Sequence, residues 1–256
     1  PVRLVRATPT VAAQWLSNVF TLTNQAGDTV TGSRMISVVV IDQGRIHADS
    51  PLGSGLRVDG TMTNNGMLGA DAGTLILGNG SLTTGGTIET INGGQVLVNV
   101  GTARIGDLVL NADVNVTGSS EFLSLESSVT NNGTITVNSS LLVFNSHLTF
   151  LNEGTIGGTG EVRLQSLGDF GDAQVFTQGA FNGTIGANQT SRGSGQVDGR
   201  TGGTIVNLGV INADDPAVAL SLRGNHIGGG EYRADGGVMD LANSLSIQNA
   251  VFNTSA

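Results

Sequence analysis

The chain of 256 residues contains no cysteine and no lysine, and all 11 of its basic residues are arginine. The lack of cysteine excludes disulfide bonds and thiolate metal sites. The lack of lysine excludes Schiff-base chemistry and lysine–asparagine crosslinks, because both need the lysine amine. Aromatic residues make up only 4% of the chain, which is low for a globular core. Its core must therefore be built from aliphatic side chains.

Charged residues are also scarce, at 12% of the chain, and the net charge is −9. A thinly spread negative charge is unfavourable for binding phosphate backbones, so we expect no nucleic-acid partner. No apolar run approaches the ~20 residues that a membrane-spanning helix needs, and we expect no membrane span. No signal-peptide pattern is found near the N-terminus.

Glycine, by contrast, is abundant, with 40 residues, and many of them lie in a short phrase that recurs along the chain. Asn132-Gly133-Thr134-Ile135 returns as Glu153-Gly154-Thr155-Ile156, a shift of 21 residues. Variants of the phrase contain Gly66, Gly86, Gly183, Gly203 and Gly209. Most of these glycines are separated by about 20 residues or a multiple of it, which is typical of a solenoid.

Short strand-like segments lie between the turn residues, two or three to each repeat unit. This rhythm favours a parallel β-helix, in which each strand pairs with its equivalent in the next turn about 4.8 Å away. The hairpins of a β-sandwich would also give short strands, but they would have no reason to repeat one phrase. The sequence therefore predicts an all-β fold, a right-handed parallel β-helix (β-solenoid) with turns of about 20 residues, over residues 59–256.

The expected strands alternate apolar and polar residues, as a half-buried strand requires. They are Thr74–Leu77, Thr87–Ile91, Gln95–Val100, Asp107–Leu110, Asp113–Val116, Glu121–Leu125, Thr134–Val137, Leu141–Phe144, Leu148–Leu151, Glu161–Leu164, Ala173–Thr177, Thr204–Val206, Ala217–Leu222, Val238–Leu241 and Leu245–Ile247. In the repeated phrase, glycine is expected to form a corner closed to other residues, with threonine facing out and isoleucine entering the core. The corner residues are Gly66, Gly86, Gly133, Gly154, Gly183, Gly203, Asn65, Asn132 and Asn182. We expect the asparagines to hydrogen-bond nearby backbone or one another along the axis.

Residues 1–58 lack the phrase and are expected to form an N-terminal capping or assembly segment. Thr8-Pro9 can start a helix that places Trp15, Val19 and Phe20 on one face. A strand is the equal alternative, because the same residue types suit a sheet. Met35–Ile41 is the most continuous apolar run and predicts a short buried strand.

The phrases Thr130–Ile135 and Leu151–Ile156 resemble the repeats of bacterial secreted β-helix proteins, in particular autotransporter passengers and filamentous-haemagglutinin-type adhesins. The resemblance covers roughly residues 58–256 and rests on a short, degenerate motif. It implies a surface or extracellular location and a structural or adhesive role. No autotransporter barrel accompanies the repeats, and residues 1–58 match no secretion domain.

Candidate catalytic groups are few. Asp214-Asp215 is the one adjacent acidic pair, with His226 eleven residues further on. Pectin-degrading β-helix enzymes also group aspartates with a nearby histidine, but their additional Asn-Thr-Asp and Arg-Ile-Lys sites are missing here. Asp214-Asp215-Pro216 is more simply explained as a polar turn, and His47 and His147 are isolated. We expect no cofactor, with one calcium ion at an acidic corner as the alternative.

The sequence therefore favours an extracellular structural or adhesive β-solenoid of a bacterial surface, without enzymatic activity. The repeats continue to Phe252 without a cap, so we expect either a longer parent protein or stacking of the open end on a second copy. Two alternatives remain open. The first is a glycan-active β-helix (a lyase, hydrolase or tailspike-like depolymerase), and the second is a carbohydrate-binding module that contacts host or matrix glycans.

Overall fold

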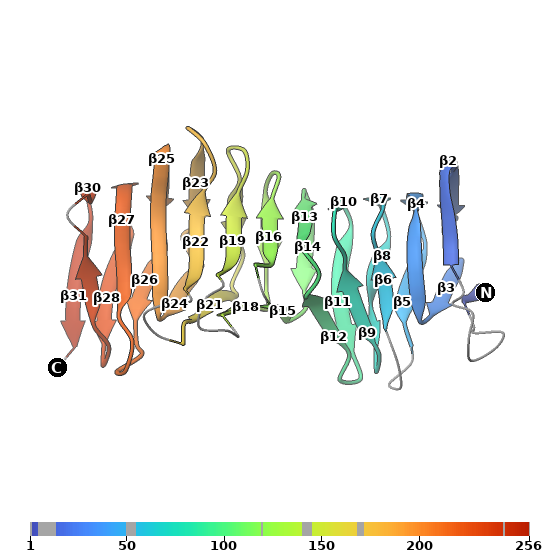
Figure 1. Ribbon diagram of the computed structural model, residues 1–256, viewed down its shortest axis with the longest axis horizontal. Helices are drawn as coiled ribbons and strands as arrows, with labels where there is room; N and C mark the ends of the chain where they lie inside the picture. Colours follow the sequence, from blue (N-terminus) through green and yellow to red (C-terminus); the bar gives the residue numbers. More distant parts are fainter. Residues whose placement is uncertain are drawn as a thin grey trace.

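The computed structural model describes residues 2–4, 14–49, 55–118, 120–139, 145–167, 172–242 and 244–255. All regular secondary structure in these ranges is β-strand, and every strand pairs in parallel with the equivalent strand of the next turn. Successive turns are spaced by about 21 residues. Figure 1 shows the result: an elongated molecule whose strands cross its long axis, with the two chain ends at opposite ends. The predicted β-solenoid is confirmed.

The strands form three parallel stacks that run the length of the molecule, each turn contributing to stack A, then B, then C. Stack A contains β1 (Val2–Leu4), β3 (Thr29–Gly32), β5 (Arg45–Ala48), β8 (Met67–Asp71), β11 (Thr87–Ile91), β14 (Leu108–Asn111), β17 (Val129–Asn131), β20 (Thr155–Gly157), β23 (Asn182–Ile185), the second parts of β25 (Gly195–Asn207) and β27 (Leu220–Ile227), and β30 (Ser246–Gln248).

Stack B contains the first parts of β2 (Gln14–Asn24) and β4 (Arg34–Asp42), then β6 (Leu56–Val58), β9 (Thr74–Leu77), β12 (Gln95–Val98), β15 (Val114–Gly118), β18 (Thr134–Ser139), β21 (Glu161–Gln165), β24 (Thr190–Gly193), β26 (Val210–Ala213), β28 (Glu231–Asp235) and β31 (Val251–Ser255). Stack C contains the second parts of β2 and β4, then β7 (Thr61–Asn64), β10 (Ser81–Thr84), β13 (Thr102–Gly106), β16 (Phe122–Leu125), β19 (Ser146–Phe150), β22 (Ala173–Thr177), the first parts of β25 and β27, and β29 (Met239–Leu241).

The core is a narrow column of aliphatic side chains enclosed by the three stacks. Because alternate residues of a strand point to opposite faces, the apolar positions of each strand fall into rows along the axis. One row of stack B shows the pattern: Leu75, Val96, Val114, Ile135 and Val162 lie over one another in successive turns, and each is buried. Burial of β-branched and leucine side chains in such rows supplies the main stabilising free energy.

Most of the expected strands are found within two residues of their predicted bounds. Leu141–Phe144 lies outside the described residues. The helix expected from Thr8 is contradicted where the structure describes it, because β2 makes Trp15 to Phe20 part of a strand that pairs with β4. Residues before Gln14 in that segment are not described. Strands β3 to β6 continue the same stacks, and the capping role of residues 1–58 stays a prediction.

The repeated phrase marks entry into a strand, at two different corners. Gly66, Gly86 and Gly154 precede strands of stack A, whereas Gly133 precedes β18 of stack B. At each entry the threonine or its equivalent is partly exposed and the following Ile or Leu is buried, as expected. Gly183 differs, because it lies within β23. Gly203 directly precedes Thr204, where the continuous strand β25 passes from stack C into stack A.

The corner glycines are required for two separate physical reasons. Gly86 has a φ of 60°, in the left-handed region that other residues enter at a cost. Gly66 and Gly133 instead lie against the preceding turn, where a Cβ atom would collide with the carbonyl oxygens of Gly44 and Ala112.

The asparagines that brace the corners are buried and are not the predicted ones: Asn64 lies one residue before the predicted Asn65, and Asn207 was not predicted. Asn64 is fully buried; its Oδ1 accepts from the Gly66 N–H (3.0 Å) and its Nδ2 donates to the Thr87 carbonyl of the next turn (3.1 Å). Asn207 makes the equivalent two contacts. Its Oδ1 accepts from the Gly209 N–H (3.1 Å), and its Nδ2 donates to the Glu231 carbonyl (3.2 Å).

The three predicted asparagines are exposed. Asn132 donates to Asn111 Oδ1 of the preceding turn at 2.9 Å, so a stacked amide pair does form on the surface. Asn182 lies within β23, and Asn65 lies beside the buried Asn64.

The difference between buried and exposed asparagine gives a direct test. Asn64→Ala should lower the free energy of unfolding by about 1–3 kcal/mol, because the Gly66 N–H and the Thr87 carbonyl lose a buried partner. Asn65→Ala, at the adjacent exposed position, should change it by less than about 0.5 kcal/mol. Urea unfolding at neutral pH measures both, and equal losses would contradict the assigned roles.

Candidate functional site

An open groove of about 420 Å³ lies on the outer face of stack B, at the edge where the chain enters from stack A. It crosses four successive turns, because Thr134, Glu161 and Thr190 are the first residues of β18, β21 and β24, and Asp113 immediately precedes β15. We call it the stack B groove; the side chains that line it and matter below are Asp113, Thr134, Thr159, Glu161, Thr190 and Arg192.

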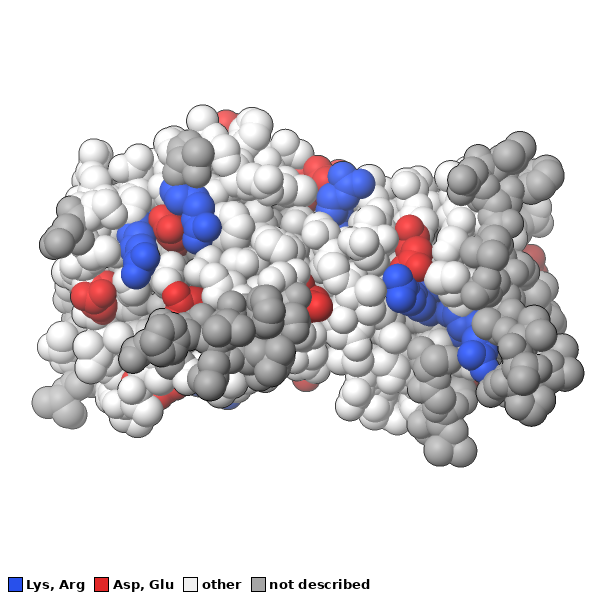
Figure 2. Space-filling view, in the orientation of Figure 1, with Lys and Arg blue, Asp and Glu red and all other residues white. Residues whose placement is uncertain are grey.

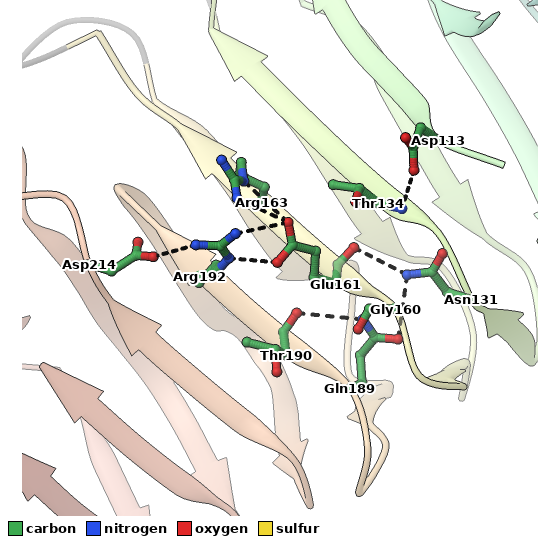
Figure 3. A network of polar contacts seen from close by, with 10 residues as sticks. All are labelled: Asp113, Asn131, Thr134, Gly160, Glu161, Arg163, Gln189, Thr190, Arg192 and Asp214. Atoms are coloured by element: carbon green, nitrogen blue, oxygen red, sulfur yellow. Dashed lines mark hydrogen bonds and ion pairs between the residues drawn. The ribbon is translucent and has the colours of Figure 1, made fainter. Parts of the chain in front are cut away.

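Glycine corners and buried amides form the floor of the groove. Gly133 and Gly160 lie over one another without side chains, and the next residue in the column, Gln189, turns inward and is fully buried. Gln189 Nε2 donates to the Gly160 carbonyl at 2.7 Å, and Asn131 Nδ2 donates to the Glu161 carbonyl at 3.2 Å (Figure 3). These contacts hold the corner backbone of two turns in place beneath the groove.

A charged network forms one wall of the groove. Arg192 contacts Glu161 through Nε (2.6 Å) and Nη2 (3.2 Å), and its Nη1 contacts Asp214 Oδ2 at 2.7 Å (Figure 3). Arg163 adds a second guanidinium 3.2 Å from Glu161. Burial alone would lower the pKa of Arg192, but hydrogen bonds and charges from Asp214 and Glu161 outweigh it and raise the pKa. The guanidinium is therefore held in place and neutralised by carboxylates from two neighbouring turns.

The opposite end of the groove carries a single carboxylate. Asp113 is exposed, and its Oδ1 accepts from the Thr134 backbone N–H at 2.8 Å. Its second oxygen has no partner among the described residues. Thr134, Thr159 and Thr190 also line the groove, which Asp113 and Arg192 share.

The predicted acidic pair is separated into two structural roles. Asp214 belongs to the Arg192 network, at the edge of the groove. Asp215 accepts from the Ala217 N–H at 2.9 Å and from the Ser194 hydroxyl at 2.9 Å. The Ala217 hydrogen bond is the main cause of the lowered pKa of Asp215, and burial opposes it. Asp215 thus braces the turn before β27.

The third predicted catalytic residue, His226, lies inside the solenoid. It is fully buried, 3.3 Å from the Tyr232 hydroxyl and 3.0 Å from the Arg223 carbonyl through its two ring nitrogens. Burial lowers the pKa of His226 and raises that of Tyr232 to about 12. Since His226 faces the core and the two aspartates face the surface, the structure does not bring the three together at one solvent-facing site.

Asn132 and Gly133 line the groove and were predicted only as structural corner residues. The sequence did not single out Glu161, Arg163 and Arg192, although a weak signal exists. Glu161 and Arg163 are two apart on one strand and so share its outer face. Arg192 can be recognised as their neighbour only when the length of the turn between them is known, and this turn is longer than the average.

Other charged groups also form pairs across turns. Arg45 reaches over an intervening turn to Glu89 at 3.2 Å, and Arg104 contacts Glu126 of the next turn at 2.9 Å. Figure 2 shows few charged groups on the face in view, with basic and acidic side chains next to one another and uncharged surface between them. Within the described ranges, no three His, Asp or Glu side chains gather as metal ligands do.

None of the described segments is a helix long and apolar enough to cross a membrane. Comparisons of the chain with protein-family models, with curated proteins and with solved structures find no match. What is shown is the fold: the chain is a β-solenoid repeat protein.

Proposed function

We propose that this chain is a structural and adhesive β-solenoid on the outside of a bacterial cell, acting as a rigid rod that presents its outer faces. The observation that carries the proposal is the use of charge. Pairs such as Arg192–Glu161, Arg192–Asp214 and Arg104–Glu126 join one turn to the next. Charged side chains that already pair with one another between turns favour a structural role over an enzymatic one. An autotransporter-passenger-like or haemagglutinin-like identity is part of the same proposal.

The resistance to proteases that we expect of a solenoid supports a role outside the cell. In a solenoid each strand is hydrogen-bonded on both sides, so cleavage requires local opening of a turn. Protease digestion of the folded protein should leave the stacks intact.

Location is tested with antibodies raised against the folded protein and applied to intact cells of the source organism. We expect gold label on the outside of unbroken cells. Label that appears only after the envelope is permeabilised would contradict the proposed location.

We propose a second copy of the chain as the partner of the last described turn. There, Phe252 occupies the core row of stack B, stacks on Tyr232 with ring centroids 5.3 Å apart, and is nevertheless 52% exposed. Leu241 of the same turn is 51% exposed. All strands run parallel in the same three stacks, so β2 of another copy has the direction needed to add to this edge. A non-closing contact of this kind generates filaments.

Sedimentation and negative-stain microscopy test the stacking. We expect concentration-dependent assemblies along the rod axis, and Phe252→Asp should return them to single rods because a carboxylate would be buried at the contact. Thr87→Asp, on the partly exposed outer face of β11 and away from the last turn, is a matched control with the same added charge. A wild-type protein that stays a single rod at high concentration would contradict the proposal and point to further chain as the natural cover.

A further inference from the structure

The stack B groove has the chemistry of a binding site for a hydroxyl-rich, uncharged ligand. We propose that it binds a short segment of neutral oligosaccharide lying along the rod axis. This inference rests on the adhesive part of the proposed function and names the ligand class for it. It also assigns the groove residues to recognition, in addition to their part in holding turns together.

The charge of the groove excludes an acidic ligand. Among the described residues that line it, Arg192 is the one cation, and its guanidinium is already neutralised by Glu161 and Asp214. A carboxylated or sulfated sugar would have to displace one of these partners and would meet repulsion from Asp113. An uncharged ligand meets neither cost.

The unused hydrogen-bonding groups match a sugar. A guanidinium has five N–H donors, and three are used in the contacts of Arg192 with Glu161 and Asp214, which leaves two. The free oxygen of Asp113 is an acceptor, and the hydroxyls of Thr134, Thr159 and Thr190 are both donors and acceptors. A sugar presents hydroxyls with the same dual character along its whole length, so each group finds a partner.

The spacing of these groups favours an extended ligand along the axis. Thr134 pairs in register with Glu161, and Glu161 pairs with Thr190, so the two threonines stand on strands two turns apart with Glu161 between them. Turns lie about 4.8 Å apart, so the path from Asp113 to Arg192 covers three steps, or about 14 Å. A monosaccharide would reach only part of this path.

The groove is formed before any ligand arrives. Its floor is fixed by the buried amides of Asn131 and Gln189, and both corner glycines contact the preceding turn so closely that any side chain would collide with it. A preformed site needs no ordering on binding, which lowers the entropy cost for a weak ligand.

The test uses isothermal titration and amide NMR shifts of the whole chain with maltotriose, cellotriose and mannotriose, and with trigalacturonate as the acidic probe. We expect at least one neutral trisaccharide to bind with Kd near 1 mM or tighter and to shift the amides of Thr134 and Thr190. Trigalacturonate should bind more weakly than that neutral sugar.

Variants locate the site. Thr134→Val and Thr190→Val keep shape and remove one hydroxyl each, so each should weaken binding about fivefold, the loss of one hydrogen bond. Asp113→Asn keeps the acceptor for the Thr134 N–H and should weaken binding by a similar factor. Thr87→Val, on stack A, is the matched control and should leave the affinity unchanged.

Three results would overturn the inference: no binding of any neutral trisaccharide at about 10 mM, tighter binding of trigalacturonate, or an equal loss in Thr87→Val. Each leaves the proposed function standing, because surface location is measured separately with antibodies on intact cells. If the protein bound a neutral trisaccharide but were found inside the cell, the binding site would be supported and the proposed surface location contradicted.

Discussion

Lowering the pH from 6.5 to 4 is expected to remove about 3 kcal/mol of stability through one side chain, His147. His147 is in β19, on the outer face of stack C, and only 7% exposed. Its ring stacks on Phe122 of the preceding turn (centroids 4.4 Å apart) and meets the edge of Phe176 in the next turn (5.1 Å). The imidazole is thus enclosed by hydrocarbon.

Burial is the main reason that the pKa of His147 falls to about 4; the charge of Arg200 lowers it further, and a hydrogen bond with the Gln174 side chain opposes the shift. Arg200 lies close by, over the Phe176 ring at 4.0 Å. In the unfolded chain the pKa is near 6.5. Between these two values the unfolded chain takes up a proton that the folded protein excludes, so stability is complete above pH 6.5 and falls steadily toward pH 4.

The measurement is urea unfolding of wild type and His147→Phe at several pH values from 7 to 4. Phenylalanine keeps a ring between Phe122 and Phe176 and removes the titration, so the difference between the two proteins should grow as the pH falls. Carboxylates contribute equally to both and cancel. His47→Phe is the control: His47 is only half-buried, and a smaller change is expected. A parallel pH dependence of wild type and His147→Phe would refute the prediction.

Most of the fold could be predicted from the sequence, because each turn repeats the same pattern of short alternating strands and glycine corners. Alternation of Val, Ile and Leu with polar residues identifies strands such as Thr74–Leu77 and Thr87–Ile91 to the residue. Glycine before Thr-Ile identifies strand entry. Neither signal says which stack the strand joins, because the same phrase precedes strands of both stack A and stack B. That is why Gly133 and Gly154, 21 residues apart, lead into different stacks.

The buried asparagines show a second limit of the sequence. Asn64 and Asn65 are adjacent, and which of them faces inward depends on where the strand ends, since side chains alternate between faces. The stack B groove shows a third. Asp113, Glu161 and Arg192 are far apart in sequence, and irregular insertions between them hide the register that the stacking imposes.

A single methyl group at Gly183 is expected to cost about 2–3 kcal/mol of stability. Gly183 lies in β23 of stack A and is buried. A Cβ atom there would overlap the ring of Phe150, which is fully buried at the end of β19. The ring is enclosed by neighbouring turns and cannot move aside without displacing them. The sequence predicts a corner at Gly183, whereas the structure shows that the missing side chain leaves the space that the Phe150 ring fills.

Gly157→Ala is the matched control, because Gly157 lies in β20 of the same stack and has no positive φ. Apart from its chain neighbours, no atom lies within 4 Å of the position that a Cβ atom would take there. Its replacement should be neutral or stabilising by up to about 1 kcal/mol, through reduced freedom of the unfolded chain. Equal effects of the two substitutions in urea unfolding would show that the ring does not occupy this space.

A double-mutant cycle separates the clash from the general cost of a β-strand alanine. Phe150→Ala alone should cost about 3–5 kcal/mol, the usual loss for a buried ring. In that background Gly183→Ala should cost less than about 0.5 kcal/mol, because its methyl group then enters the vacated space. The coupling free energy should therefore be about 2 kcal/mol in favour of the double variant. Strictly additive losses would mean that Gly183 is required for its backbone and not for the ring packed against it.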